Sequence, residues 1–340
     1  MFGYNLQKCR LILLILLVGL LFAFWCAEGV IAQGGGKAGE SQNSQSSKKQ
    51  KDGRAKKKPA PFRWVNPLQP SGVKTPGLRH ATFKSPSMNT KVGYCIYLPA
   101  EYGKPAGSKK RYPVVYYLHG GRPGNELKSI KLAAEIDRAI TAQKVAPMIY
   151  VFVNGGPVSH YNMPDDRGAQ GADVFINELI PHVDSTYRTI ADRAGRGIEG
   201  FSQGGRGTAR LMFRHPDLFC SASPGGGGHA TEKKISESAG QESANLTFAK
   251  GDNTWDLAAV YLDQLKSDAS LSPLSILVHV GDKGFNYENN LAWMAYLKSL
   301  GIKHQKIIVP DVGHSAMEIY KNRGLEIMRF HEKNFGVRRP

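Results

Sequence analysis

A five-residue pattern near the middle of the chain constrains the fold more than any other feature: Gly200-Phe201-Ser202-Gln203-Gly204. The spacing Gly-x-Ser-x-Gly is typical of a nucleophile elbow, in which a strand ends, the chain turns sharply and a helix begins. Small residues two positions before and after the serine are needed because the turn crowds the backbone. An apolar strand over 198–201 and a helix over 205–214 would flank the turn. The pattern therefore predicts Ser202 as a nucleophile at the apex.

Strand and helix patterns alternate from about residue 75 to the end of the chain. Short runs of β-branched and aromatic residues predict strands over 92–98, 114–118, 148–153, 198–201, 218–223, 274–280 and 305–309. Apolar residues at helical spacing predict helices over 126–142, 173–187, 205–214, 255–266, 291–300 and 315–334. This alternation predicts an α/β fold with a mostly parallel sheet covered by helices on both faces. Sites in such sheets form in the loops at the carboxyl ends of the strands.

A serine hydroxyl needs a general base, and an acid usually orients that base. In the α/β-hydrolase order the acid and then the histidine follow the serine along the chain. His314, directly after the last predicted strand, is the predicted base, and His229 is the runner-up. Asp282 ends the preceding strand and is the predicted acid, with Asp311 and Glu288 as alternatives.

An oxyanion hole needs backbone N–H groups aimed at the developing negative charge. The residue after the nucleophile, Gln203, should supply one of them. The other should come from the loop after the strand at 114–118, where we expect Gly121, with Arg122 as the alternative.

The segment 157–170 is polar and aromatic and follows a predicted strand end. Its residues His160, Tyr161 and Asn162 are candidates to line the substrate pocket. Packing within a surface loop explains them equally well.

The N-terminal part of the chain differs from the rest. Lys8 and Arg10 precede an almost wholly apolar run over 11–27, and small or aliphatic residues lead to Ala32. We interpret residues 1–32 as a secretory signal peptide cleaved after Ala32, which predicts a secreted, periplasmic or cell-envelope protein. The alternative is an uncleaved membrane anchor formed by residues 11–27.

Residues 33–75 are predicted to form a basic, low-complexity disordered linker before a catalytic domain over 76–340. Between positions 33 and 63, nine Lys and Arg residues face two acidic ones, so that +7 of the formal charge of +17 lies there. A solvated spacer explains this charge, and adhesion to an anionic cell-envelope polymer is the alternative. No motif for specific nucleic-acid binding is present in the domain.

The cysteines and histidines predict no metal site, because no cluster has metal-ligand spacing. Cys95 and Cys220 remain after signal cleavage, and both lie in apolar strand-like runs. We expect two buried free thiols rather than a disulfide.

Four motifs in a fixed order resemble the putative-esterase family, which includes esterase D, feruloyl and acetylxylan esterases, enterochelin esterase and the mycolyltransferases. They lie at residues 116–121, 178–188, 200–205 and 313–315. The resemblance spans roughly residues 85–335 and implies an α/β-hydrolase fold, no cofactor, and catalytic roles for Ser202 and His314.

The resemblance has one departure. Feruloyl-esterase-like members usually carry Gly-x-x-Asp after the strand that delivers the acid. The corresponding residues here are Gly281-Asp282-Lys283-Gly284, so that Gly284 stands where the aspartate is expected. Either Asp282 has taken over the role, or the register differs, or the acid is weak or absent.

These observations favour a secreted serine carboxylic-ester hydrolase that acts through an acyl-enzyme. Its substrate would be an acylated carbohydrate or a similar small ester. Two alternatives stay open: a catalytically degenerate hydrolase-fold protein that binds carbohydrate or another envelope component, and an acyltransferase that uses an envelope acceptor.

Overall fold

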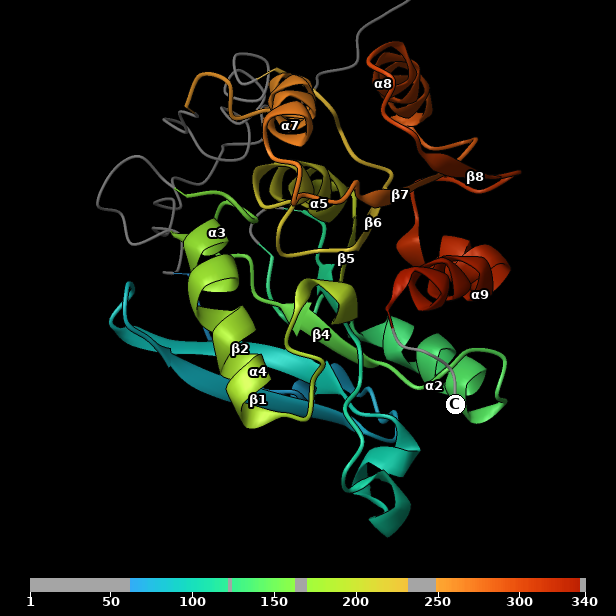
Figure 1. Ribbon diagram of the computed structural model, residues 1–340. Helices are drawn as coiled ribbons and strands as arrows, with labels where there is room; N and C mark the ends of the chain where they lie inside the picture. The colour runs from blue at the N-terminus through green and yellow to red at the C-terminus, as the bar shows by residue number, and fades with distance from the viewer. Residues whose placement is uncertain (1–61, 122–123, 163–169, 232–248, 337–340) are drawn as a thin grey trace, which may run out of the picture. The chain divides into compact units, whose positions relative to one another are not determined.

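The computed structural model describes residues 62–121, 124–162, 170–231 and 249–336. The predicted signal peptide, most of the predicted linker and Arg122 lie outside these ranges. The described residues contain an eight-stranded sheet in the order β1-β2-β4-β3-β5-β6-β7-β8 (Figure 1). Strands β1 and β2 form an antiparallel hairpin, β2 pairs antiparallel with β4, and the remaining neighbours are parallel.

The strands are short and separated by helices, as the alternation predicts. Their bounds are β1 Leu78–Ser85, β2 Thr90–Tyr97, β3 Val114–Leu118, β4 Ile149–Val153, β5 Arg196–Phe201, β6 Ser221–Gly225, β7 Ser275–Gly281 and β8 Gln305–Val309. The helices are α2 Ala133–Thr141, α3 Gly171–Asp173, α4 Ile180–Thr186, α5 Gln203–Arg214, α7 Asp256–Ser267, α8 Tyr287–Ser299 and α9 Ala316–Asn334. A π-helical segment, Val174–Leu179, joins α3 to α4. Single 3-10 turns lie at Gln69–Ser71, Ala100–Gly103, Pro105–Gly107, Ile130–Leu132 and Arg193–Gly195.

Two apolar cores cover the two faces of the sheet. Every residue of β3 and β4 is buried, as expected for central strands that have helices on both sides. One core joins the sheet to the α3–α4 segment, α5, α7 and α8, and the other joins it to α2 and α9. Figure 1 shows α2 and α9 together on one side of the sheet, with α5 and α7 on the other. The predicted α/β fold with helices on both faces is confirmed.

The folded part begins earlier in the chain than the sequence indicates. The Trp64 carbonyl accepts a hydrogen bond from the Gly93 N–H at 2.6 Å, and the Asn66 N–H donates to the buried Glu126 carboxylate at 2.7 Å. Residues 62–75, which the sequence assigns to the linker, therefore pack on the domain. The segment is held by these hydrogen bonds and by packing of Trp64, Leu68 and Val73 on the core, contacts that its composition does not reveal.

Both remaining cysteines are buried free thiols, as predicted. Burial raises the pKa of the Cys95 thiol to about 12, so that this thiol is not a reactive thiolate at neutral pH. Among the described residues, none of the helices has the length and apolarity that crossing a membrane would require.

Candidate active site

Ser202 lies at the apex of the turn between β5 and α5, so that the predicted strand, turn and helix are all present. Its backbone has φ 61° and ψ −118°, which non-glycine residues rarely adopt. The Ser202 N–H donates to the Gly225 carbonyl at 2.9 Å, and its own carbonyl accepts from the Arg206 N–H at 3.0 Å. These bonds hold the strained conformation, which is a frequent property of functional residues.

The glycines of the pattern are required by close backbone contacts. A Cβ atom on Gly200 would lie 2.6 Å from the Gly204 carbonyl oxygen, and one on Gly204 would overlap the Leu118 carbonyl oxygen. Distances this short do not occur between real atoms, so a side chain at either position would displace a strand or the helix. The elbow is therefore built against the end of β3.

The loop after β3 faces the serine. A Cβ atom on Gly120 would lie 3.7 Å from Ser202 Oγ. The next residue, Gly121, has a left-handed φ of 75°, and its carbonyl accepts a hydrogen bond from the Ser159 hydroxyl. The ammonium group of Lys128 lies where a side chain on Gly121 would project. Gln203, the other predicted oxyanion donor, is the first residue of α5, where backbone N–H groups point out of the helix.

Two buried histidines support this loop. His119 Nε2 accepts a hydrogen bond from the Gly155 N–H at 3.1 Å, and His119 Nδ1 pairs with the Gly120 carbonyl at 3.2 Å. His160 Nε2 donates to the His119 carbonyl at 3.0 Å. Burial lowers the pKa of His119 well below its usual value and lowers the pKa of His160 to about 4. Both imidazoles are therefore neutral near pH 7, and they fix the loop rather than transfer protons.

The three predicted pocket-lining residues all make packing or hydrogen-bonding contacts within the domain. His160 and Tyr161 are fully buried, and the Arg210 guanidinium group lies 3.6 Å from the centre of the Tyr161 ring. The Asn162 side-chain oxygen accepts from the N–H groups of Ala172 and Asp173, each at 3.1 Å, at the start of α3. These contacts fix the three side chains in place, and their role in lining a substrate pocket stays a prediction.

His314 lies beside the elbow, in the loop between β8 and α9. Its ring is 4.7 Å from the ring of Phe201 and 4.2 Å from the ring of Phe285, measured between centroids. Partial burial between these rings lowers the pKa of His314 below 6.5. Its Nδ1 atom pairs with the side-chain oxygen of Asn286 at 3.2 Å.

Among the described residues, neither the predicted acid nor its two alternatives make a hydrogen bond to His314. Asp282 directly follows β7, where its N–H donates to the Val309 carbonyl at 3.1 Å. Its Oδ2 atom is 3.9 Å from the Lys283 ammonium, and its Oδ1 atom is buried. The Asp311 side chain is 90% exposed and lies 3.9 Å from the same ammonium, and Glu288 is exposed on α8. The hydrogen bond expected from Asp282 is made by Asn286, the residue directly before α8.

His229, the runner-up base, is fixed inside the protein. Its ring stacks on Trp293 with the centroids 3.9 Å apart, and Nδ1 pairs with the Thr254 hydroxyl at 3.1 Å. Burial lowers its pKa to about 3. His229 is therefore a packing residue.

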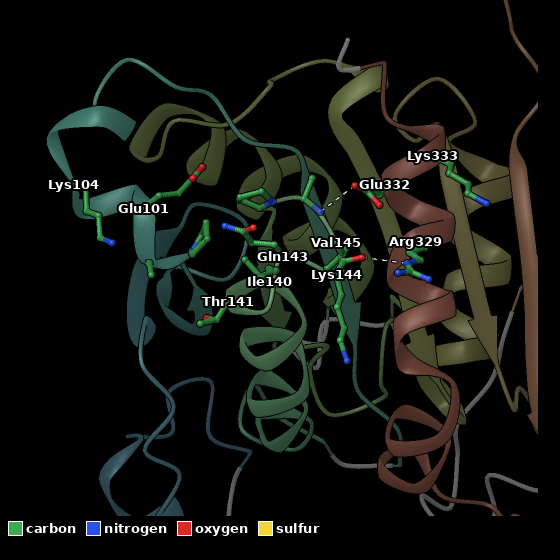
Figure 2. A pocket seen from close by; sticks show the side chains of 14 residues that line it. Glu101, Lys104, Ile140, Thr141, Gln143, Lys144, Val145, Arg329, Glu332 and Lys333 are labelled. Carbon is green, nitrogen blue, oxygen red and sulfur yellow. Dashed lines mark hydrogen bonds between the residues drawn. The ribbon is translucent and has the colours of Figure 1, made fainter. Parts of the chain in front are cut away.

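The described surface also has an open cavity of about 1010 Å³ on another part of the molecule. It lies between the ends of α2 and α9, at the amino end of β4, whereas Ser202 follows the carboxyl end of β5. Figure 2 shows its charged lining, in which Glu332 accepts from the Ala146 N–H at 3.0 Å and Arg329 donates to the Lys144 carbonyl at 3.1 Å. This cavity does not include the elbow or His314.

Comparison with known proteins agrees with the geometry of the elbow. The model of the putative esterase family matches residues 85–306, which is more than half of the chain. The chain belongs to the putative esterase family. An esterase of Mycobacterium tuberculosis is 30% identical over 151 residues, covering 44% of this chain and 32% of the relative. An endo-1,4-beta-xylanase/feruloyl esterase of Xylanibacter ruminicola is 30% identical over 152 residues, covering 42% of this chain and 20% of the relative.

A solved ferulic acid esterase has the same fold as this esterase-family chain. The two share 24% identity and a TM-score of 0.62, over 76% of this chain and 98% of the solved one. The curated relatives are longer proteins, and the chain spans a third or less of their length.

Three residues near the elbow escape the sequence analysis: Lys128, Phe285 and Asn286. Phe285 is the more exposed of two large hydrophobic residues on the described surface, with 84% of its area accessible. Asn286 is buried and lies two residues after Gly284, the expected position of the family aspartate. The sequence argument considers only carboxylates as partners of His314 and so does not consider an amide. The position of Asn286, five residues after Gly281, could have indicated it as a candidate.

Proposed function

We propose that this chain is a secreted serine carboxylic-ester hydrolase that acts on an acylated carbohydrate or a similar small ester. The observation that carries the proposal is a serine in a strained elbow, with a histidine anchored through Nδ1 beside it. The family and the fold support the same chemistry.

In this mechanism Ser202 Oγ attacks the ester carbonyl while His314 Nε2 accepts the hydroxyl proton. The N–H groups of Gly121 and Gln203 stabilise the oxyanion of the tetrahedral intermediate. His314 then donates the proton to the leaving alcohol, which departs and leaves an acyl ester on Ser202. Water attacks this ester, again with His314 as the base, and releases the acid and the free serine.

A second function is favoured by one specific observation. An uncharged amide, and not a carboxylate, contacts His314, and position 284 carries no side chain. A hydrolase-fold protein that has lost catalysis and binds its ester or carbohydrate ligand would tolerate both features.

A serine-directed fluorophosphonate probe separates the two functions. The enzyme is expected to be labelled on Ser202, and labelling should fall strongly in His314→Ala because the base is lost. His304→Ala is the matched control, since this partly buried histidine lies just before the amino end of β8, at the edge of the parallel sheet opposite Ser202. Absence of labelling in the folded, unaltered protein would favour the binding protein.

Phe285 offers an exposed aromatic surface against the predicted base. We expect the acyl group of the substrate to pack on this ring. Phe285→Ala should then raise KM for an aryl-acyl ester about tenfold, because burying a large apolar side chain contributes roughly 1.5–3 kcal/mol. Steady-state kinetics with aryl-acyl and acetyl esters would measure the effect. Val260→Ala on α7 is the control, being the other exposed large hydrophobic residue of the described surface. An unchanged KM for both esters would exclude substrate contact by Phe285.

Secretion and the basic linker form a further part of the proposal. Cleavage after Ala32 predicts that the protein recovered from the medium of a secreting host has a mass that begins at Gln33. Adhesion of residues 33–75 to an anionic envelope polymer predicts salt-sensitive binding that weakens when Lys48, Lys49 and Lys51 are changed to glutamine. A recovered protein that still carries residues 1–32 would refute the cleavage. Polymer binding that the lysine changes do not weaken would refute the adhesion.

A further inference from the structure

We propose that Asn286 takes the place of the triad acid and holds His314 in the tautomer that can accept the Ser202 proton. This inference rests on the proposed hydrolase function. Its starting observation is the contact of 3.2 Å between His314 Nδ1 and the Asn286 side-chain oxygen. Because that oxygen only accepts, the proton sits on Nδ1 and the lone pair on Nε2 is available to the serine.

An asparagine in this position works only if its amide cannot turn around. When the NH₂ group faces the imidazole, the proton moves to Nε2 and the base is lost, at a cost of about 10⁴ in rate in a serine protease. Here the Asn286 NH₂ group donates to the Gly226 carbonyl, and Gly226 is itself held by its N–H bond to the His279 carbonyl at 2.8 Å. The acceptor beside the NH₂ group assigns the amide orientation and leaves the oxygen toward His314.

Asn286 is also placed as a rigid side chain. It is 6% exposed, and its backbone carbonyl accepts a hydrogen bond from the Asn290 side chain at 2.8 Å. It occupies the N-cap position of α8, where an asparagine side chain usually caps the helix, yet it makes no capping bond. Its side-chain oxygen instead contacts His314, and its NH₂ group donates to the Gly226 carbonyl.

Position 284 lies next to the contact between Asn286 and His314. A Cβ atom on Gly284 would lie 3.5 Å from the Asn286 side-chain oxygen and 3.8 Å from the backbone nitrogen of His314. A side chain on residue 284 would therefore project toward the same contact. The backbone of Gly284 is outside the left-handed region, so a larger residue is permitted there with a small shift of the Gly281 carbonyl, 3.1 Å away.

A neutral partner changes how the histidine titrates. A carboxylate favours the imidazolium ion, whereas an amide does not. The charged or titratable groups on the elements around His314 are Asp282, Lys283, Asp311, Glu318, Arg206 and His279. Burial is the dominant cause that lowers the pKa of His314. Since the base must be neutral, a lowered pKa extends activity to pH values below 6.5.

The test compares variants by the pH dependence of kcat/KM, whose acid limb reports the base in the free enzyme. Asn286→Ala should lower kcat by roughly 10²–10⁴-fold. Asn286→Asp should stay active, with the acid limb shifted upward by about 1–3 pH units because a carboxylate now faces the imidazole. Gly284→Asp in the Asn286→Ala background should restore part of the rate and show the same upward shift.

Asn289→Ala is the matched control. This asparagine lies on the same helix, and its amide both accepts and donates one hydrogen bond with the His229 backbone, at 2.6 and 2.7 Å. It should leave the acid limb unmoved. The inference is overturned if Asp282→Asn removes the activity while Asn286→Ala retains it, or if Asn286→Asp leaves the acid limb in place. If the unaltered protein shows neither turnover nor fluorophosphonate labelling, the hydrolase function itself fails.

Discussion

Replacing Ser202 by alanine is expected to lower kcat/KM for p-nitrophenyl acetate by ~10⁵-fold or more. In this variant the backbone N–H groups of the oxyanion hole stay in place, but the oxygen atom that forms the acyl-enzyme is removed. Electrostatic stabilisation without a nucleophile leaves only a small residual acceleration. Initial rates at saturating and low ester concentration would measure the loss.

The interpretation depends on an intact fold. Alanine has a Cβ atom like serine, so the strain at φ 61° stays, and the melting temperature should change little. Ser299→Ala, on the exposed end of α8, provides the control for handling and ester background. Turnover that survives in folded Ser202→Ala would contradict the proposed mechanism.

Replacing Arg210 by alanine is expected to have the largest effect on stability. Arg210 is 1% exposed, donates from Nε to Asp252 at 3.0 Å and from Nη1 to the His160 carbonyl at 3.1 Å, and packs over Tyr161. Truncation leaves the buried partner charge without its main counter-charge, which costs about 3–5 kcal/mol. For a domain of this size the melting temperature should fall by roughly 10 °C.

Arg214→Ala is the matched comparison for this effect. Arg214 bonds to the same Asp252 carboxylate at 2.9 Å, but its side chain is 39% exposed. A solvent-screened pair of this kind contributes at most about 1 kcal/mol. Thermal or urea denaturation would compare the two variants, and equal losses of stability would show that burial does not govern the contribution of these pairs.

The sequence predicts the elements whose information is local. The Gly-x-Ser-x-Gly spacing specifies a turn in which side chains at 200 and 204 would collide with the backbone, and the structure contains that turn. The alternation of apolar runs likewise predicts the layered sheet, because every parallel strand needs a covering helix. His314 is found beside the elbow because its loop follows the last parallel strand.

The remaining features depend on contacts between distant residues. The sequence predicts Asp282 because a carboxylate ends the right strand, but the direction of a side chain there depends on β8 and Lys283. His160 and Tyr161 look suited to a pocket, yet a buried arginine on α5 packs them into the interior. Residue type alone does not distinguish a buried aromatic residue from one that faces a ligand.

The backbone of Ser202 has a wider consequence. A conformation of this kind costs of order 1–3 kcal/mol for a residue with a side chain, while glycine adopts it readily. Selection for a long-lived fold would therefore favour glycine at position 202. Selection for ester chemistry is the pressure that would keep a hydroxyl there. Thermal stability and turnover are thus opposed at a single residue, and engineering that increases one at this position would sacrifice the other.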